Sequence, residues 1–140
     1  ALDPNRDVPP PASGDGAIVW HELATSDPEG ALAFYGALFG WSKGRTMAPS
    51  SDAGHAYHLI ADQGKDVAGL MELPDPSIPR PYWLQYVQVA DVAGTARRAV
   101  AMGGQTLHGP VDLADGHGRI AVVQDPTGAW IGIWQSASKG

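Results

Sequence analysis

Residues 17–40 have the sequence AIVWHELATSDPEGALAFYGALFG, in which a strand pattern passes directly into a helix pattern. The first ten or so residues alternate between apolar and polar, as in a strand with one buried face. Asp27 can cap a helix, Pro28 suits the first helical position, and Glu29 is favoured in the first turn. Apolar residues then recur at helical spacing until Gly40, which can adopt the left-handed conformation that ends a helix. We therefore predict a strand followed by one amphipathic helix.

Three strand-like pieces complete this unit, and then the whole pattern repeats. The first three are WSKGRTMA, HAYHLIAD and DVAGLMEL, and a proline-rich connector follows them. The second copy has the strand YWLQYVQVA, a helix after Asp91, and the strand-like pieces QTLHGPVDL, RIAVVQD and WIGIWQ. Asp27 and Asp91 are 64 positions apart, while Gly69 and Gly132 are 63 positions apart. The offset falls by one through a single-residue deletion in the second copy, and an otherwise constant offset marks a repeat. We therefore predict two βαβββ units, at about residues 17–73 and 82–135.

Composition and charge limit the functions that the chain could have. The 140 residues, 44% hydrophobic and 17% charged, fit one globular domain at 17–140 behind a proline-rich arm at 1–16. A formal net charge of -6 argues against nucleic acid as a partner, and the lack of cysteine excludes disulfides, thiolate metal sites and cysteine nucleophiles. No apolar run approaches the roughly 18 residues of a membrane span. We expect a soluble protein without a membrane partner, cytoplasmic by default.

The duplicated pattern, with SDPEGALAFYGALFGW in the first unit and GHGRIAVVQDPTGAWIGIWQ in the second, resembles the vicinal oxygen chelate superfamily. That superfamily includes glyoxalase I, bleomycin-resistance proteins and extradiol dioxygenases, and the strings WHELATSDPEG and VAGLMELP are most similar to its glyoxalase-like domain proteins. The resemblance covers residues 17–135. It implies an α+β fold in which two tandem βαβββ units form a curved mixed sheet, a cup with helices on its convex side. It also implies a homodimer.

The superfamily places its metal ligands on the first and last strand of each unit. We locate those positions here by their spacing along the sequence from Asp27, Asp91 and the Asp-Pro-x-Gly turn, and through the repeat. They are Trp20, Gly69, Leu84 and Gly132. A first-row divalent ion needs imidazole, carboxylate or thiolate ligands, which an indole, an isobutyl group and two glycines do not supply. We therefore predict no cofactor. A divalent metal ion stays possible only through a different ligand set, for which the candidates are His21, His58 and Glu72.

Strand alternation extends these four positions to a predicted lining of the cup, because residues two apart on a strand point the same way. The side chains predicted to share that face are Trp20, Glu22, Ala24, Val67, Gly69, Met71, Leu84, Tyr86, Gln88, Trp130, Gly132 and Trp134. The set is mostly aromatic or apolar with two polar groups, which is typical of a small-molecule pocket. The alternative is that the aromatic rings simply close the interior as a core.

Glu22 is the candidate catalytic residue. A carboxylate on an apolar inner face either has a raised pKa and acts as an acid or base, or pairs with a cation, unless it is a solvated rim residue. His21 points to the opposite face unless the strand register slips by one residue. His55 and His58 form an H-x-x-H pair that a strand would split across the sheet, and His58 is the better candidate for a cup contact.

Two functions remain open at this point. The first is metal-free binding of an apolar or aromatic small molecule, as bleomycin-resistance proteins sequester a drug. Its predicted contacts are Trp20, Glu22, His58, Met71, Leu84, Tyr86, Gln88, Trp130 and Trp134. The second is an enzyme, a glyoxalase-like lyase, isomerase or dioxygenase that uses Glu22 as general base or depends on a metal ion.

Overall fold

The structure is a computed structural model of the chain and describes residues 14–47, 56–73, 77–78, 80–113 and 116–137. Residues 1–13 of the predicted arm, and His55, lie outside the described residues. Both predicted βαβββ units are present. Their elements in chain order are β1 (Ile18–Thr25), α1 (Pro28–Phe39), β2 (Ser42–Met47), β3 (Tyr57–Asp62), β4 (Lys65–Glu72), β5 (Tyr82–Gln88), α2 (Val92–Ala101), β6 (Gln105–Asp112), β7 (Arg119–Gln124) and β8 (Trp130–Gln135).

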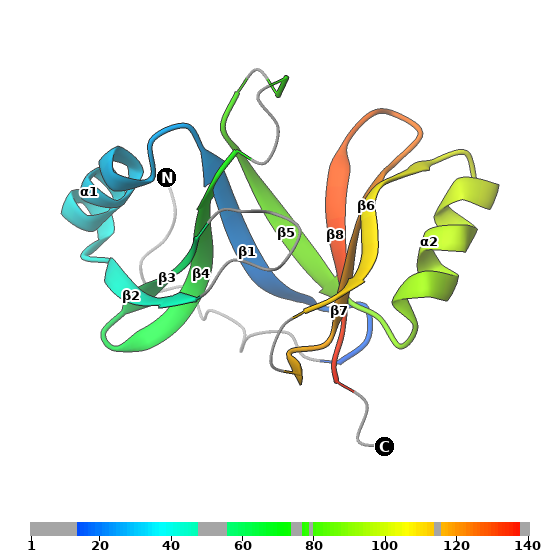
Figure 1. Ribbon diagram of the computed structural model, residues 1–140, viewed down its shortest axis with the longest axis horizontal. Coiled ribbons are helices and arrows are strands. Elements are labelled where there is room, and N and C mark those ends of the chain that lie inside the picture. Colours follow the sequence, from blue (N-terminus) through cyan, green and yellow to red (C-terminus); the bar gives the residue numbers. More distant parts are fainter. Residues whose placement is uncertain (1–13, 48–55, 74–76, 79, 114–115, 138–140) are drawn as a thin grey trace, which may run out of the picture.

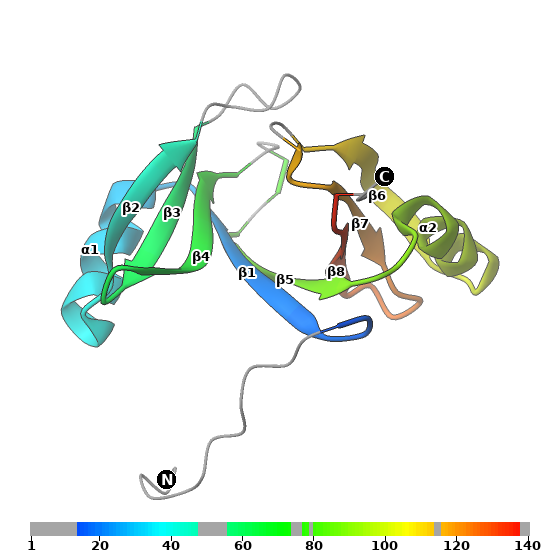
Figure 2. The ribbon, with the colours of Figure 1, turned by 90° about the horizontal axis from the view of Figure 1, so that it is seen from below.

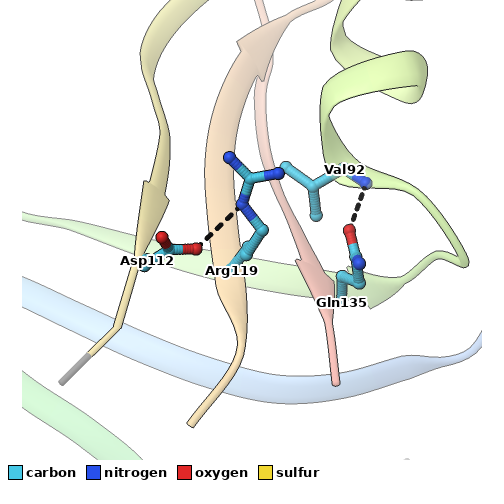
Figure 3. Close-up of polar contacts among 4 residues, drawn as sticks. All are labelled: Val92, Asp112, Arg119 and Gln135. Atoms are coloured by element: carbon cyan, nitrogen blue, oxygen red, sulfur yellow. Dashed lines mark hydrogen bonds and ion pairs between the residues drawn. The ribbon is translucent and has the colours of Figure 1, made fainter. Parts of the chain in front are cut away.

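The two helices begin by different means although they occupy equivalent places in the repeat. At α1 the Asp27 side chain accepts a hydrogen bond of 3.0 Å from the Gly30 amide, and Gly40 ends the helix at φ 78°. At α2 the Asp91 side chain makes no such bond. The Val92 amide donates instead to the Gln135 side-chain oxygen at 2.9 Å, beside an ion pair between Arg119 and Asp112 on the neighbouring strands (Figure 3). The second helix is therefore anchored by the last residue of β8.

The eight strands form one mixed sheet with the order β2-β3-β4-β1-β5-β8-β7-β6. In the middle of Figure 1, β1 and β5 run side by side and antiparallel, and they join the two units within one chain. β1 is parallel to β4 with Glu22 opposite Gly69, and β5 is parallel to β8 with Tyr86 opposite Gly132. These two pairs occupy equivalent positions, so the offsets of 64 and 63 residues found in the sequence reflect a repeated register.

The sheet curves into an open cup, and both helices lie on its outer side, as expected (Figure 2). One core cluster packs under α1 and consists of Leu23, Ile60, Ala68 and Leu70. The other packs under α2 and consists of Val92, Ala96, Ala121, Val123 and Ile133. Burial of these aliphatic side chains against the helices supplies the main stabilising term, and it fixes which side of each strand faces the cup.

One residue of the predicted lining does not follow the alternation. Val67 packs against the cluster under α1, together with Leu70 and Ala68. An irregularity in the pairing of β3 with β4, between Ile60 and Ala61, accounts for this, because a bulge changes which side chains face one way. Among the described residues, no helix has the length and apolar character needed to cross a membrane.

Candidate functional site

Glu22 lies on the cup side of β1, near the junction of the two units. It is partly buried, and its neighbours across the sheet are Gly69 on β4 and Leu84 on β5. The Tyr86 hydroxyl donates a hydrogen bond of 3.2 Å to Glu22 Oε2. Tyr86 itself is only 4% exposed. The carboxylate predicted to lie in the cup therefore does so, held by a phenol from the other unit.

A second phenol reaches the same carboxylate from β3. The Tyr57 hydroxyl hydrogen-bonds to Glu22 and accepts a hydrogen bond of 2.8 Å from Trp20 Nε1. The result is a short chain of polar contacts, from the Trp20 indole through Tyr57 to Glu22 and on to Tyr86. We call Trp20, Glu22, Tyr57 and Tyr86 the Glu22 cluster.

Two glycines give these phenols their space. A Cβ added at Gly69 would collide with the Tyr57 hydroxyl and come within 2.9 Å of its Cε1. A Cβ added at Gly132 would lie 2.5 Å from Cε1 and 2.8 Å from Cγ of Tyr86. Carbon atoms normally approach to about 3.5–4.0 Å, so each ring occupies the place where a side chain would begin. The glycines are thus part of the site although they carry no functional group.

Burial is the main influence on the titration of this site. Desolvation raises the pKa of Glu22 above its ordinary value near 4.5, and the hydrogen bonds from Tyr57 and Tyr86 oppose that rise. Burial and the nearby Glu22 charge both raise the pKa of Tyr57 and of Tyr86. The two phenols therefore keep their protons at neutral pH and act as hydrogen-bond donors to the carboxylate.

Aromatic rings continue along the cup from this cluster. Tyr82 lies two residues before Leu84 on β5, and its pKa is also raised, first by burial and then by the Glu22 charge. Its ring meets Trp130 edge to face, with centroids 5.3 Å apart. The Trp130 indole donates to the Gln124 side chain at 3.0 Å, and the Trp134 indole donates to the His117 carbonyl at 2.9 Å. The predicted aromatic character of the lining is thus present in both units.

The remaining predicted ligand contacts are placed less centrally. Leu84 is buried and opposite Glu22, and Met71 is partly buried and opposite Ala24. Gln88 is four residues beyond Leu84, at the end of β5, and borders a shallow surface cavity of about 770 Å³ beside the start of α2. The two polar points predicted for one pocket, Glu22 and Gln88, therefore lie at separate places along the sheet.

The predicted cup contact at His58 is wrong in its placement. His58 pairs with Leu70, which packs under α1, and its Nδ1 lies 2.9 Å from the Thr46 hydroxyl. Because neighbours on a strand face opposite ways, it is Tyr57 that enters the cup and His58 that does not. His21 is likewise beside Glu22 on the other face and is exposed.

A metal centre does not fit these residues. The alternative set of His21, His58 and Glu72 lies away from the cup face, and in the part of the chain that the structure describes no three His, Asp or Glu residues gather as metal ligands would. At the superfamily's positions, Gly69 and Gly132 are covered by tyrosine rings. Trp20 and Leu84 offer no lone pair to a divalent ion. The space at these four positions holds phenols and a hydrogen-bonded carboxylate instead.

Tyr57 and Tyr82 belong to the site but are absent from the predicted lining. Tyr82 is two residues before Leu84 and therefore shares its face of the strand. Tyr57 is the neighbour of His58 and therefore faces the opposite way. The available signal was the alternation itself, because Tyr57 and His58 are neighbours on β3 and face opposite ways.

Comparison with known proteins agrees with this architecture. A sequence model of the Glyoxalase/Bleomycin resistance protein/Dioxygenase superfamily matches residues 17–133. "Putative glyoxylase CFP32" of Mycobacterium bovis is 37% identical over 122 residues, 87% of this chain and 45% of that protein. "Anthracycline biosynthesis protein DnrV" of Streptomyces peucetius is 31% identical over 133 residues, 86% of this chain and 47% of that protein. The chain therefore spans about half the length of these curated relatives.

Among solved structures, methylmalonyl-CoA epimerase from Mycobacterium tuberculosis superposes with a TM-score of 0.61 at 19% identity, covering 87% of this chain and 89% of that one. At this identity the likeness concerns the fold alone. The family match extends from the start of β1 into β8 and so includes both units and the Glu22 cluster. The chain belongs to the Glyoxalase/Bleomycin resistance protein/Dioxygenase superfamily.

Proposed function

We propose that this protein binds a small planar, aromatic or apolar molecule in its cup without a metal ion. The observation that carries the proposal is the composition of the concave face, where aromatic side chains from both units surround one hydrogen-bonded carboxylate. Rings supply a large contact area at low entropic cost, and a single polar group orients the ligand. The likeness to a protein named for anthracycline biosynthesis supports an aromatic ligand, because anthracyclines are planar polycyclic compounds.

Nuclear magnetic resonance of the five tryptophan indole N–H groups tests this proposal directly. We titrate the ¹⁵N-labelled chain with 2-naphthol, a neutral bicyclic probe. The indole signals of Trp20 and Trp130, which lie in the cup, should shift, while that of Trp83 on the helix side should not. Shifts confined to Trp83, or none up to millimolar probe, would refute binding in the cup.

A matched pair of variants separates cup binding from general surface binding. Trp130 and Trp83 are each 40% exposed, and they lie on opposite faces of the sheet. Trp130→Ala should weaken 2-naphthol binding by about 1–2 kcal/mol, roughly 5- to 30-fold, through loss of ring contact. Trp83→Ala removes an equally exposed ring that contacts Tyr35 of α1 and should leave the affinity unchanged.

Proton transfer by Glu22 is the second candidate function, and the raised pKa of this carboxylate favours it. In this case Glu22 takes a proton from a carbon next to a ligand carbonyl and returns one from solvent. The probe is 2-tetralone in deuterium oxide. The wild type should accelerate deuterium incorporation at the carbon between ring and carbonyl, and Glu22→Gln should abolish the acceleration while largely sparing binding. Equal incorporation with both proteins would reject this candidate.

We also propose that the chain forms a homodimer with α1 in the interface. Helix α1 carries exposed apolar side chains, with Phe34 at 61% and Leu38 at 59% exposure, and its only charged residue is Glu29. The matched part leaves more than half of each curated relative unmatched, so in those proteins further chain accompanies this unit. In the proposed dimer a second copy of the chain covers α1. Sedimentation should show a dimer that Leu38→Glu dissociates, whereas Met102→Glu, just after α2, should not.

A further inference from the structure

We infer that the Glu22 cluster selects ligands that carry a hydroxyl group on an aromatic ring and accepts a hydrogen bond from that hydroxyl. This inference rests on the proposed binding function and names the chemistry of the ligand. It goes beyond the lining of the cup, because it assigns a preference to one group of atoms: the Glu22 carboxylate with the phenols of Tyr57 and Tyr86.

The count of donors and acceptors carries the argument. Three members of the Glu22 cluster can each donate one hydrogen bond: the Trp20 indole, the Tyr57 hydroxyl and the Tyr86 hydroxyl. The Trp20 hydrogen goes to Tyr57, and both phenol hydrogens go to the Glu22 carboxylate. Within the cluster's own side chains, every donor is therefore already used.

Acceptor capacity, in contrast, is left over. A carboxylate has two oxygens with about four lone-pair directions, and the two phenols fill only two of them. The Tyr86 oxygen has lone pairs as well. A ligand carbonyl would bring a further acceptor to this group and leave it unsatisfied, whereas a ligand hydroxyl would supply the missing hydrogen. Burial strengthens the carboxylate as an acceptor, because it raises its affinity for a proton.

The surroundings of Glu22 indicate what the hydroxyl is attached to. Tyr82 lies two residues from Leu84, the partner of Glu22 across the sheet, and therefore on the same face, and its ring meets Trp130 edge to face. An aromatic surface thus begins beside the carboxylate. A hydroxyl joined directly to a planar ring would let the ring contact these side chains while its oxygen meets Glu22.

Two naphthalenes of nearly equal size test the inference on the unmodified protein. 2-Naphthol has a hydroxyl donor, and 2-methoxynaphthalene has an oxygen that can only accept. The wild type should bind 2-naphthol at least about tenfold more tightly than 2-methoxynaphthalene, because a hydrogen bond to a charged group has about that energy. The shifts of the Trp20 and Trp130 indole signals measure both affinities. Equal affinities, or tighter binding of the methyl ether, would overturn the inference and leave the proposed binding function intact. If neither compound shifts these signals, the binding function itself fails.

Variants then locate the preference. At a pH above the raised pKa of Glu22, Glu22→Gln replaces an ionised acceptor by a neutral amide and should reduce the preference for 2-naphthol to about threefold or less. Glu29→Gln removes the same charge from the exposed first turn of α1 and should keep the full preference. Retention of the full preference in a folded Glu22→Gln variant would also overturn the inference. The two-ligand comparison on the wild type decides the matter even if this variant does not fold.

Discussion

Replacement of Gly132 by alanine should destabilise the protein only while the Tyr86 ring is present. Alanine is ordinarily better than glycine in a strand by about 0.5–1 kcal/mol. Here, however, the new Cβ would lie 2.5 Å from Cε1 and 2.8 Å from Cγ of Tyr86. Both residues belong to paired central strands, and Tyr86 is 4% exposed, so a shift of the ring would disturb packed neighbours. Overpacking of this kind costs about 1–3 kcal/mol.

The expected numbers form a double-mutant cycle. In the wild type, Gly132→Ala should lower the free energy of unfolding by about 1–2 kcal/mol, the clash exceeding the strand gain. In a Tyr86→Ala background the same change should raise it by about 0.5–1 kcal/mol. The coupling energy is therefore about 2 kcal/mol. Tyr86→Ala itself costs about 3–5 kcal/mol of the roughly 7–20 expected for 140 residues, so the background should still fold.

Urea unfolding followed by tryptophan fluorescence measures all four proteins. A coupling below about 0.5 kcal/mol would refute the reasoning, because the alanine would then cost the same with or without the ring. That result would mean that Tyr86 does not lie over Gly132.

Other predictions concern Glu22 and the helix starts. Because burial raises the Glu22 pKa in the folded state, the stability that its protonation confers is present below about pH 4.5 and is lost as pH rises through the folded pKa. From pH 4 to 8 the wild type should therefore lose stability relative to Glu22→Gln in urea unfolding, and a constant difference would contradict this. Asp27→Ala should cost about 0.5–2 kcal/mol through loss of its cap, whereas Asp91→Ala, which removes no cap bond, should cost clearly less; equal losses in thermal unfolding would count against the capping assignment. Gln135→Met should destabilise by about 1 kcal/mol, since it leaves the Val92 amide without its acceptor, and an unchanged melting temperature would show that the bond contributes nothing.

Much of the fold could be predicted because each unit repeats the same signals at a fixed offset. Asp27 and Gly40 mark the ends of α1, and the offset of 64 transfers the helix start to Asp91. The equivalent pairs Glu22 with Gly69 and Tyr86 with Gly132 follow from a repeated register. The repeat by itself does not specify whether each unit pairs with the other or with a unit of a second chain. In the structure β1 pairs antiparallel with β5 of the same chain.

The site was less predictable, because its central contacts join residues far apart in the chain. Alternation placed Glu22 and Tyr86 on one face, but the bond from Trp20 to Tyr57 depends on the order of strands across the sheet. The sequence around a glycine does not indicate which aromatic side chain will pack over it. Gly69 therefore indicated a lost metal ligand, and only the structure shows that Tyr57 fills the space.

The duplication has a chemical consequence for the origin of this site. Glu22 and Tyr86, which share a hydrogen bond, are the same position of the two units, 64 residues apart. Two identical single-unit chains would place the same residue at both positions, so the contact would join two carboxylates, which repel, or two phenols without an anion. A complementary acid and phenol require the two units to differ in sequence, and fusion in one chain leaves each half free to diverge while keeping the two together. Fusion thus allows a polar pair that a symmetric assembly of separate units could not contain.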